Sequence, residues 1–318
     1  MLAPERNSGH THHVEATITN RLIGVEIEAV IPIIGAGQNQ DVQQLLASVL
    51  SNHGLPAVAR PYSHQPLPSG CLLVVEHDSS LRDESRFAGI RWAKIEIKTA
   101  PLPWPEIERI LPPALEITNY LGARNNASTG LHVHVHLPEA VERPEVVRNL
   151  AHLWWRFHQV VYGLVAPSRQ NNQYCRKPTQ ADATMFDHVR TYPRLTAKLA
   201  RCDRYMGLNL TNLASDTRRT VEWRLHGGST DWSKISAWIL ATQRWVEHAV
   251  ARSCHYRPEP VSNTQAGLNA LLISTGLKPN SRIYKRVDKP LRQAGRFLLR
   301  RWKHFNQPQQ TKAKSEAA

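Results

Sequence analysis

Four segments of the chain alternate apolar and polar residues, which is the pattern of β-strands with one buried face. In residues 130–138 (GLHVHVHLP) the polar positions are three histidines: His132, His134 and His136. The same alternation recurs with other polar residues in 21–32 (Glu26, Glu28), 91–103 (Lys94, Glu96, Lys98) and 220–228 (Glu222, Arg224, His226). An ordinary solvated face would also carry Ser, Thr and Gln. The pattern therefore predicts a shared site, although a half-exposed polar position is an equal alternative for His136.

The other segments predict helices and further strands, and so an α+β fold. Residues 71–81 and 205–213 are read as strands. Helices are predicted at about 41–54, 105–121, 144–165, 232–253 and 263–276. Residues 167–204 are polar and basic without a clear period, and long segments of this kind are often binding loops or lids.

Composition narrows the class of protein. The chain has 318 residues, of which 41% are hydrophobic, enough to bury a full core. No apolar run approaches the roughly 20 residues that span a bilayer. The first residues lack the apolar stretch of a signal peptide. The four cysteines form no CxxC pair, so we expect reduced thiols and a cytoplasmic protein.

The formal charge of +14 is concentrated near the C-terminus. Residues 257–318 hold 13 Lys and Arg against 3 Asp and Glu, which leaves the rest of the chain nearly balanced. We therefore divide the chain into a flexible N-terminus (1–20), a main domain (21–282) and a basic helical or disordered tail (283–318). The tail is a candidate surface for an acidic partner.

The polar faces of the predicted strands have the composition of a metal site. Carboxylates with one imidazole suit Mg²⁺ or Mn²⁺, which prefer oxygen ligands and bridge phosphates. Zinc would favour more His or Cys ligands. Arg224, next to such ions, would neutralise charge on a transferred phosphoryl group. The residues thus indicate a metal site that could act on a transferred phosphoryl group.

The chain resembles the amidoligase family, within the glutamine-synthetase-like carboxylate–amine ligases that include glutamate–cysteine ligase. The residues that carry the resemblance are GVEIE (24–28), HDSSL (77–81), IEIKTAPL (95–102), GLHVHV (130–135), YMGLNL (205–210) and TVEWRLHGGSTD (220–231). Three features depart from the family pattern. Ser79 follows Asp78 where a glycine is usual, Lys98 and Thr99 stand where Val and Ser are common, and residues 167–204 match no known segment.

The resemblance implies an antiparallel β-sheet funnel with helices packed on its outer face, as in glutamine synthetase. The metal ligands that it implies are Glu26, Glu28, Glu96, His132 and Glu222, with Asp78 as a further candidate. It places His134 and Arg224 at the phosphoryl group, as catalytic and nucleotide-binding residues, and Lys98 beside the nucleotide.

The leading hypothesis is a ligase that uses ATP and Mg²⁺ (or Mn²⁺) to form an amide or isopeptide bond through an acyl phosphate. Its substrates are a carboxylate and an amine, and either could be a small molecule, a peptide or a protein. A metal-dependent hydrolase or phosphotransferase could use the same ligands. A basic nucleic-acid-binding module is the third reading, but acidic strands would repel phosphate in the absence of a metal.

Overall fold

The computed structural model describes residues 14–33, 41–63, 65, 67–87, 89–251, 259–278 and 284–306. Most of the predicted flexible N-terminus and the end of the predicted tail, from residue 307, lie outside these ranges. No helix within them is long and apolar enough to cross a membrane.

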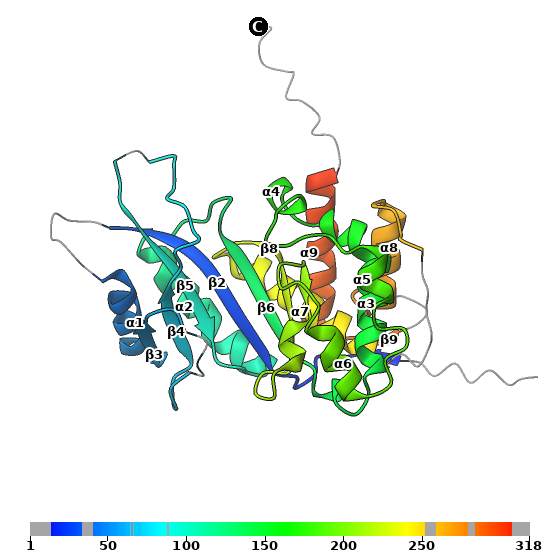
Figure 1. Ribbon diagram of the computed structural model, residues 1–318. Coiled ribbons are helices and arrows are strands. Elements are labelled where there is room, and N and C mark those ends of the chain that lie inside the picture. The colour runs from blue at the N-terminus through cyan, green and yellow to red at the C-terminus, as the bar shows by residue number, and fades with distance from the viewer. Residues whose placement is uncertain are drawn as a thin grey trace, which may run out of the picture.

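The described residues form a seven-stranded sheet with the strand order β3-β4-β5-β2-β6-β8-β7 (Figure 1). Its strands are β2 (Ile23–Pro32), β3 (Ala57–Arg60), β4 (Leu73–His77), β5 (Trp92–Thr99), β6 (Gly130–His136), β7 (Leu208–Asn209) and β8 (Thr220–Gly227). Strands β3 and β4 are parallel, whereas every other neighbouring pair is antiparallel. The predicted α+β fold with a largely antiparallel sheet is thus confirmed.

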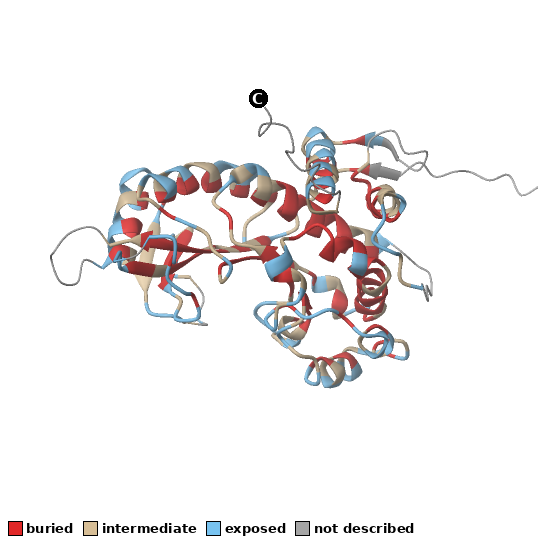
Figure 2. Cartoon of the chain, turned by 90° about the horizontal axis from the view of Figure 1, so that it is seen from above, coloured by how far each residue is buried: buried red, intermediate tan, exposed pale blue. Residues whose placement is uncertain are grey.

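Helices run along one side of this sheet, which Figure 2 shows nearly edge-on, and further helices lie at one end of it. The longer helices are α1 (Val42–Asn52), α2 (Trp104–Tyr120), α3 (Glu145–Tyr162), α7 (Trp232–Ala251), α8 (Gln265–Ser274) and α9 (Lys289–Asn306). Helix α1 packs on β4 and β5, and α7 packs on β6. They cover the apolar face that the alternation predicts, where Val25, Ile27 and Val133 are fully buried.

The predicted helix at 41 begins where the sequence indicates. The side chain of Asp41 accepts hydrogen bonds from the backbone N–H groups of Gln43 and Gln44, which satisfies two donors of the first turn. At the end of α1, Gly54 has a φ of 78°, a conformation that glycine adopts without strain. The five predicted helices are all present, with ends within a few residues of the prediction.

The segment 167–204 folds into three short helices: α4 (Pro167–Gln170), α5 (Gln180–Thr184) and α6 (Tyr192–Leu199). The strand predicted at 205–213 is mostly wrong, because only residues 208–209 pair with β8. Before them, Gly207 exchanges backbone hydrogen bonds with Arg176 and Arg224, and Thr211–Ala214 turns into the 3₁₀-helix η2. Strand β3 lies in a proline-rich stretch, residues 56–68, for which the alternation pattern predicts no strand.

Residues near the two ends of the described chain contact each other and the rest of the fold. Strand β1 (Val14–Ala16) pairs in parallel with β9 (Tyr284–Val287). Helix α9 packs against α7 and buries one face of apolar residues: Leu291, Ala294, Leu298 and Trp302. These residues recur every three or four positions, so the basic helix of the predicted tail is also amphipathic and joins the core.

Candidate functional site

The polar faces of four neighbouring strands, β5, β2, β6 and β8, form a continuous row of charged side chains. Antiparallel register sets three cross-strand pairs in this row: Glu96 with Glu28, Glu26 with His132, and His134 with Glu222. The members of each pair lie on adjacent strands, about 5 Å apart at the backbone. Residues that are up to 196 positions apart in the sequence are therefore brought together by strand pairing alone.

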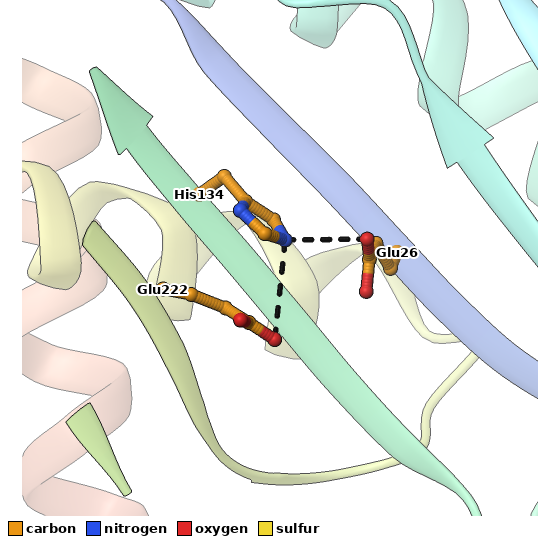
Figure 3. Close-up of side chains that lie close together, drawn as sticks. All are labelled: Glu26, His134 and Glu222. Atoms are coloured by element: carbon orange, nitrogen blue, oxygen red, sulfur yellow. Dashed lines mark ion pairs between the residues drawn. The ribbon is translucent and has the colours of Figure 1, made fainter. Parts of the chain in front are cut away.

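Glu26 lies between the two imidazoles of β6. Its Oε2 is 3.1 Å from Nδ1 of His132, and its Oε1 is 3.2 Å from Nε2 of His134. Nε2 of His134 is also 4.0 Å from Oε1 of Glu222. Figure 3 shows His134 with the two carboxylates on either side of it. The three strands β2, β6 and β8 thus converge on one carboxylate–imidazole cluster.

Opposite charges decide the ionisation of this cluster. Burial alone would raise the pKa of Glu26, but the charge of His134 and the hydrogen bond of His132 hold that pKa well below its usual value. Burial is likewise outweighed at Glu222, where His134 and Arg224 lower the pKa. Burial favours neutral His134, yet the charges of Glu26 and Glu222 raise its pKa. This part of the row is stable as ionised carboxylates beside a cationic group.

The other end of the row, at β2 and β5, carries an excess of negative charge. Oε2 of Glu28 accepts a hydrogen bond from the backbone N–H of Gly130 at 2.5 Å. Burial, with Asp78 adding to it, raises the pKa of Glu28. Burial and the charge of Glu26 raise the pKa of Glu96 well above its usual value. Buried carboxylates with raised pKa values indicate a place where a cation would be stabilised.

Lys98 is held by two carboxylates. Its Nζ is 2.7 Å from Glu96 and 2.8 Å from Glu76. Burial lowers the pKa of Lys98, but the charges of Glu96 and Glu26 outweigh this and raise it. Glu76 is fully buried on β4 and also pairs with Arg60, at 2.7 Å. The family resemblance placed Lys98 beside the nucleotide, and the sequence assigned no role to Glu76, which holds Lys98 in position.

Arg224 and Asn209 contact the two oxygens of Glu222. The guanidinium of Arg224 pairs with Oε1, and its Nε donates to the backbone carbonyl of Tyr174 at 3.3 Å. Nδ2 of Asn209 donates to Oε2 at 2.7 Å. The segment that includes Tyr174 thus reaches the edge of the site.

Among the described residues, three overlapping groups of side chains could hold a cation: Glu26 with His134 and Glu222, Glu26 with Glu96 and His132, and Glu28 with Asp78 and Glu96. In each group, one ligand atom from every residue lies within 4.8 Å of the others. The first and third groups share no residue, so two ions could bind at once. Carboxylate oxygens with at most one imidazole per group suit Mg²⁺ or Mn²⁺. The residues present therefore fit the ions that the sequence analysis expected.

Two histidines that the alternation placed on the polar face lie outside these groups. His136 is half-buried, and burial and the charge of Arg21 lower its pKa. His226 packs against Trp238 of α7 with the ring centroids 5.1 Å apart. An irregularity in the β6–β8 register, between Leu131 and Val133, shifts the alternation at this point, so the prediction for His226 is wrong.

The sequence matches a protein family over the part of the chain that forms the site. A family described as "Putative amidoligase enzyme" matches residues 19–246, which include the whole row of charged strands. The chain belongs to the amidoligase family. The resemblance that the sequence motifs indicated is thus confirmed.

Solved structures offer a more distant likeness to this amidoligase. It is similar to a chain in the crystal structure of the complex between the prokaryotic ubiquitin-like protein Pup and its ligase PafA, with 10% sequence identity and a TM-score of 0.39. The match covers 90% of this chain and 63% of that chain. No curated protein matches the sequence.

The residues that the sequence analysis assigned to the amidoligase site all lie in the row or beside it: Glu26, Glu28, Asp78, Glu96, Lys98, His132, His134, Glu222 and Arg224. Their individual roles remain predictions. The sequence assigned no role to Asn209 or to Glu76, although both lie in or next to recognised segments. For Glu76 the alternation with Asp78 was the available signal, and for Asn209 it was a lone amide in YMGLNL.

Proposed function

We propose that this amidoligase joins a carboxylate to an amine in a reaction that consumes ATP and depends on Mg²⁺ or Mn²⁺. The observation that carries the proposal is two sets of carboxylates without a shared residue. One set is Glu28, Glu96 and Asp78, which follows β4, and the other is Glu26 and Glu222 beside the imidazoles of β6. Two cations side by side suit phosphoryl transfer, in which like-charged oxygens must approach each other. The acidic face of the sheet would line a half-open funnel.

The acidic residues would bind the cations, and each has a distinct place. Glu28, Glu96 and Asp78 would hold one ion, while Glu26, Glu222 and an imidazole of β6 would hold the other. We assign His132 rather than His134 to the second ion, because Nδ1 of His132 lies 3.1 Å from Glu26 and 3.8 Å from Glu222. The raised pKa of His134 favours a protonated imidazole, which cannot bind an ion. When bound, the ions would screen the charge of the nucleotide phosphates and of the substrate carboxylate.

The cationic side chains would act on the phosphoryl group. Arg224 pairs with Glu222 at one end of the row, and there its guanidinium could also bind phosphoryl oxygens. Because the pKa of His134 is raised, its protonated imidazole would donate a hydrogen bond to the same phosphoryl group. Lys98 would lie beside the nucleotide at the opposite end. Cations on both sides of an acidic row would orient the phosphates between them.

The reaction would proceed in two steps. An oxygen of the substrate carboxylate attacks the γ-phosphorus of ATP, ADP leaves, and an acyl phosphate forms. The nitrogen of the amine then attacks the acyl carbon, inorganic phosphate leaves, and the nitrogen gives up a proton to a carboxylate. Phosphorylation is required because an unactivated carboxylate offers no adequate leaving group to an amine.

A test of the function uses Glu26→Gln and Glu222→Gln. We expect each variant to fold normally and to lose turnover, because an amide keeps the side-chain shape but removes the ligand charge. Glu116→Gln, on the exposed side of α2, is the matched control. The assay measures ADP formation with Mg²⁺ against pools of carboxylates and amines, with products identified by mass.

The result for the wild-type protein is itself informative. ADP release that requires both a carboxylate and an amine supports the ligase, whereas substrate turnover without ATP would favour a metal-dependent hydrolase. Normal activity in both glutamine variants would contradict the assignment of these two residues.

A further inference from the structure

Asn209 is a buried residue beside the site for which the proposed chemistry gives no role. It lies on the edge strand β7, directly opposite Glu222, and its side chain is 3% exposed. Its Nδ2 donates to Oε2 of Glu222 at 2.7 Å. A buried amide needs partners for both ends, so the position of its oxygen decides which way it faces.

Thr211 fixes the orientation of this amide. Oδ1 of Asn209 accepts two hydrogen bonds from Thr211, one from the backbone N–H at 2.9 Å and one from the hydroxyl at 2.8 Å. Both groups are donors, so the oxygen must face Thr211 and the NH₂ group must face Glu222. The turn into the 3₁₀-helix η2 therefore holds a hydrogen-bond donor against the carboxylate.

The contact with Asn209 divides the two oxygens of Glu222 between different tasks. Oε2 is engaged by the amide, whereas Oε1 faces the histidines, at 3.8 Å from Nδ1 of His132 and 4.0 Å from Nε2 of His134. Oε1 also pairs with Arg224, but a guanidinium can turn to phosphoryl oxygens, whereas the amide on Oε2 is fixed by Thr211. A carboxylate with one oxygen held in this way would bind an ion through the other oxygen alone.

We propose that Asn209 is a positioning residue that restricts Glu222 to a single ligand oxygen and thereby favours Mg²⁺ and Mn²⁺ over Ca²⁺. The inference rests on the proposed function, because it takes Glu222 as a ligand. Mg²⁺ requires near-octahedral geometry with ligands at fixed positions, whereas Ca²⁺ accepts bidentate carboxylates and more ligands. An amide that blocks bidentate binding would therefore discriminate against the larger ion.

The experiment measures ion binding directly, without nucleotide or turnover. Mn²⁺ binding is titrated by the electron paramagnetic resonance signal of the free ion, and Mg²⁺ and Ca²⁺ are then used to displace it. Asn209→Leu keeps the size of the side chain and removes the donor. We expect its Mn²⁺ affinity to fall about 10- to 100-fold, the usual effect of removing a partner of a metal ligand. Ca²⁺ should become a better competitor relative to Mg²⁺.

Two further variants make the result specific. Asn212→Ala, three residues along the chain, changes an amide that makes no side-chain hydrogen bond among the described residues, and should bind Mn²⁺ like the wild type. Thr211→Val leaves Asn209 in place but removes one of its two anchors, so we expect a shift in the same direction of a few-fold. This variant carries the test if Asn209→Leu does not fold.

The possible failures are distinguishable. Wild-type protein that binds no Mn²⁺ would overturn both the metal assignment and this inference. Wild-type binding that Asn209→Leu and Thr211→Val leave within twofold would overturn the role of Asn209 alone. A loss of Mn²⁺ affinity with an unchanged ratio of Ca²⁺ to Mg²⁺ competition would overturn the selectivity.

Discussion

Three histidines share one face of β6 but meet different surroundings. His132 is buried among carboxylates of β2, and His134 lies between Glu26 and Glu222. His136 is closest to the end of the strand. Burial lowers its pKa, and the charges of Arg21 and Arg219 lower it further. One strand therefore presents the same side chain to three environments, and the three residues should not be interchangeable.

Alanine substitutions of these histidines should separate their roles. His132→Ala removes a proposed ligand, so the affinity for Mg²⁺ should fall and activity should need a higher Mg²⁺ concentration. Excess metal should partly restore activity, and so should Mn²⁺, which accepts imidazole more readily. His134→Ala should lower the rate with less change in metal dependence. His136→Ala should be the most tolerated. The measurement is activity against Mg²⁺ and Mn²⁺ concentration.

A different order of metal sensitivity among the three variants would contradict the roles proposed for these histidines. If His136→Ala alone became sensitive to metal concentration and His132→Ala behaved like the wild type, the assignment of His132 to the ion shell would be contradicted.

At the scale of elements, Arg21 joins the start of β2 to the helices behind the sheet. Its guanidinium pairs with Glu139 of the 3₁₀-helix η1 (Pro138–Ala140) and with Glu247 of α7, each at 2.8 Å. It also donates to the carbonyl of His136 at the end of β6 at 2.7 Å. One side chain thus fixes the ends of the two central strands that carry the carboxylates and imidazoles.

Glu139→Gln should destabilise the protein in a pH-dependent way. Partial burial would raise the pKa of Glu139, but hydrogen bonds from Arg21 outweigh it and lower that pKa below 4.5. The carboxylate therefore stabilises the fold above its unfolded-state pKa, and this contribution is lost as the pH falls through the folded-state value. We expect a loss of about 1 kcal/mol at pH 7, because Arg21 keeps Glu247 as a partner.

Urea unfolding at pH 7 and near pH 3 provides the measurement. The difference between Glu139→Gln and wild type should shrink at the lower pH. The control is Glu142→Gln, which changes an exposed neighbour on the same turn. An equal loss at both pH values would mean that shape rather than charge holds this junction.

At the scale of the whole molecule, the C-terminal helix is part of the structural core. Leu291 and Leu298 of α9 are fully buried, and Nε of Arg301 donates to the carbonyl of Leu164 at 2.6 Å. The helix packs on α7, which in turn lies behind β6. The other basic residues of α9 are exposed, namely Lys289, Arg292, Arg296, Arg300 and Lys303, so a basic surface and a packing role coexist on one amphipathic helix.

Leu298→Ala should therefore lower the free energy of unfolding by about 2–5 kcal/mol, the range for removing a large side chain from a packed core. Arg296→Ala, on the exposed side of the same helix, should stay within about 0.5 kcal/mol of the wild type. Chemical unfolding of both variants measures the difference. A tail that is separable from the domain would leave Leu298→Ala as stable as Arg296→Ala.

The sequence by itself determined the strands of the site and the side chains on their polar faces. Alternation has a period of two, so Glu26, Glu28, His132 and His134 were assigned to faces before any strand pairing was known. The ends of helices were also determined by nearby residues, as the cap at Asp41 shows. Both signals depend only on neighbours within a few residues, which is why they could be read directly.

Only the tertiary structure decided which residues meet across the strands. The irregular register between β6 and β8 turns His226 toward Trp238, and alternation cannot reveal a bulge in advance. Asn209 reaches Glu222 because a two-residue edge strand pairs with β8, and Glu76 holds Lys98 because β4 pairs with β5. Such contacts depend on strand order and on packing between distant segments, whereas a periodic pattern fixes only the face on which each residue lies.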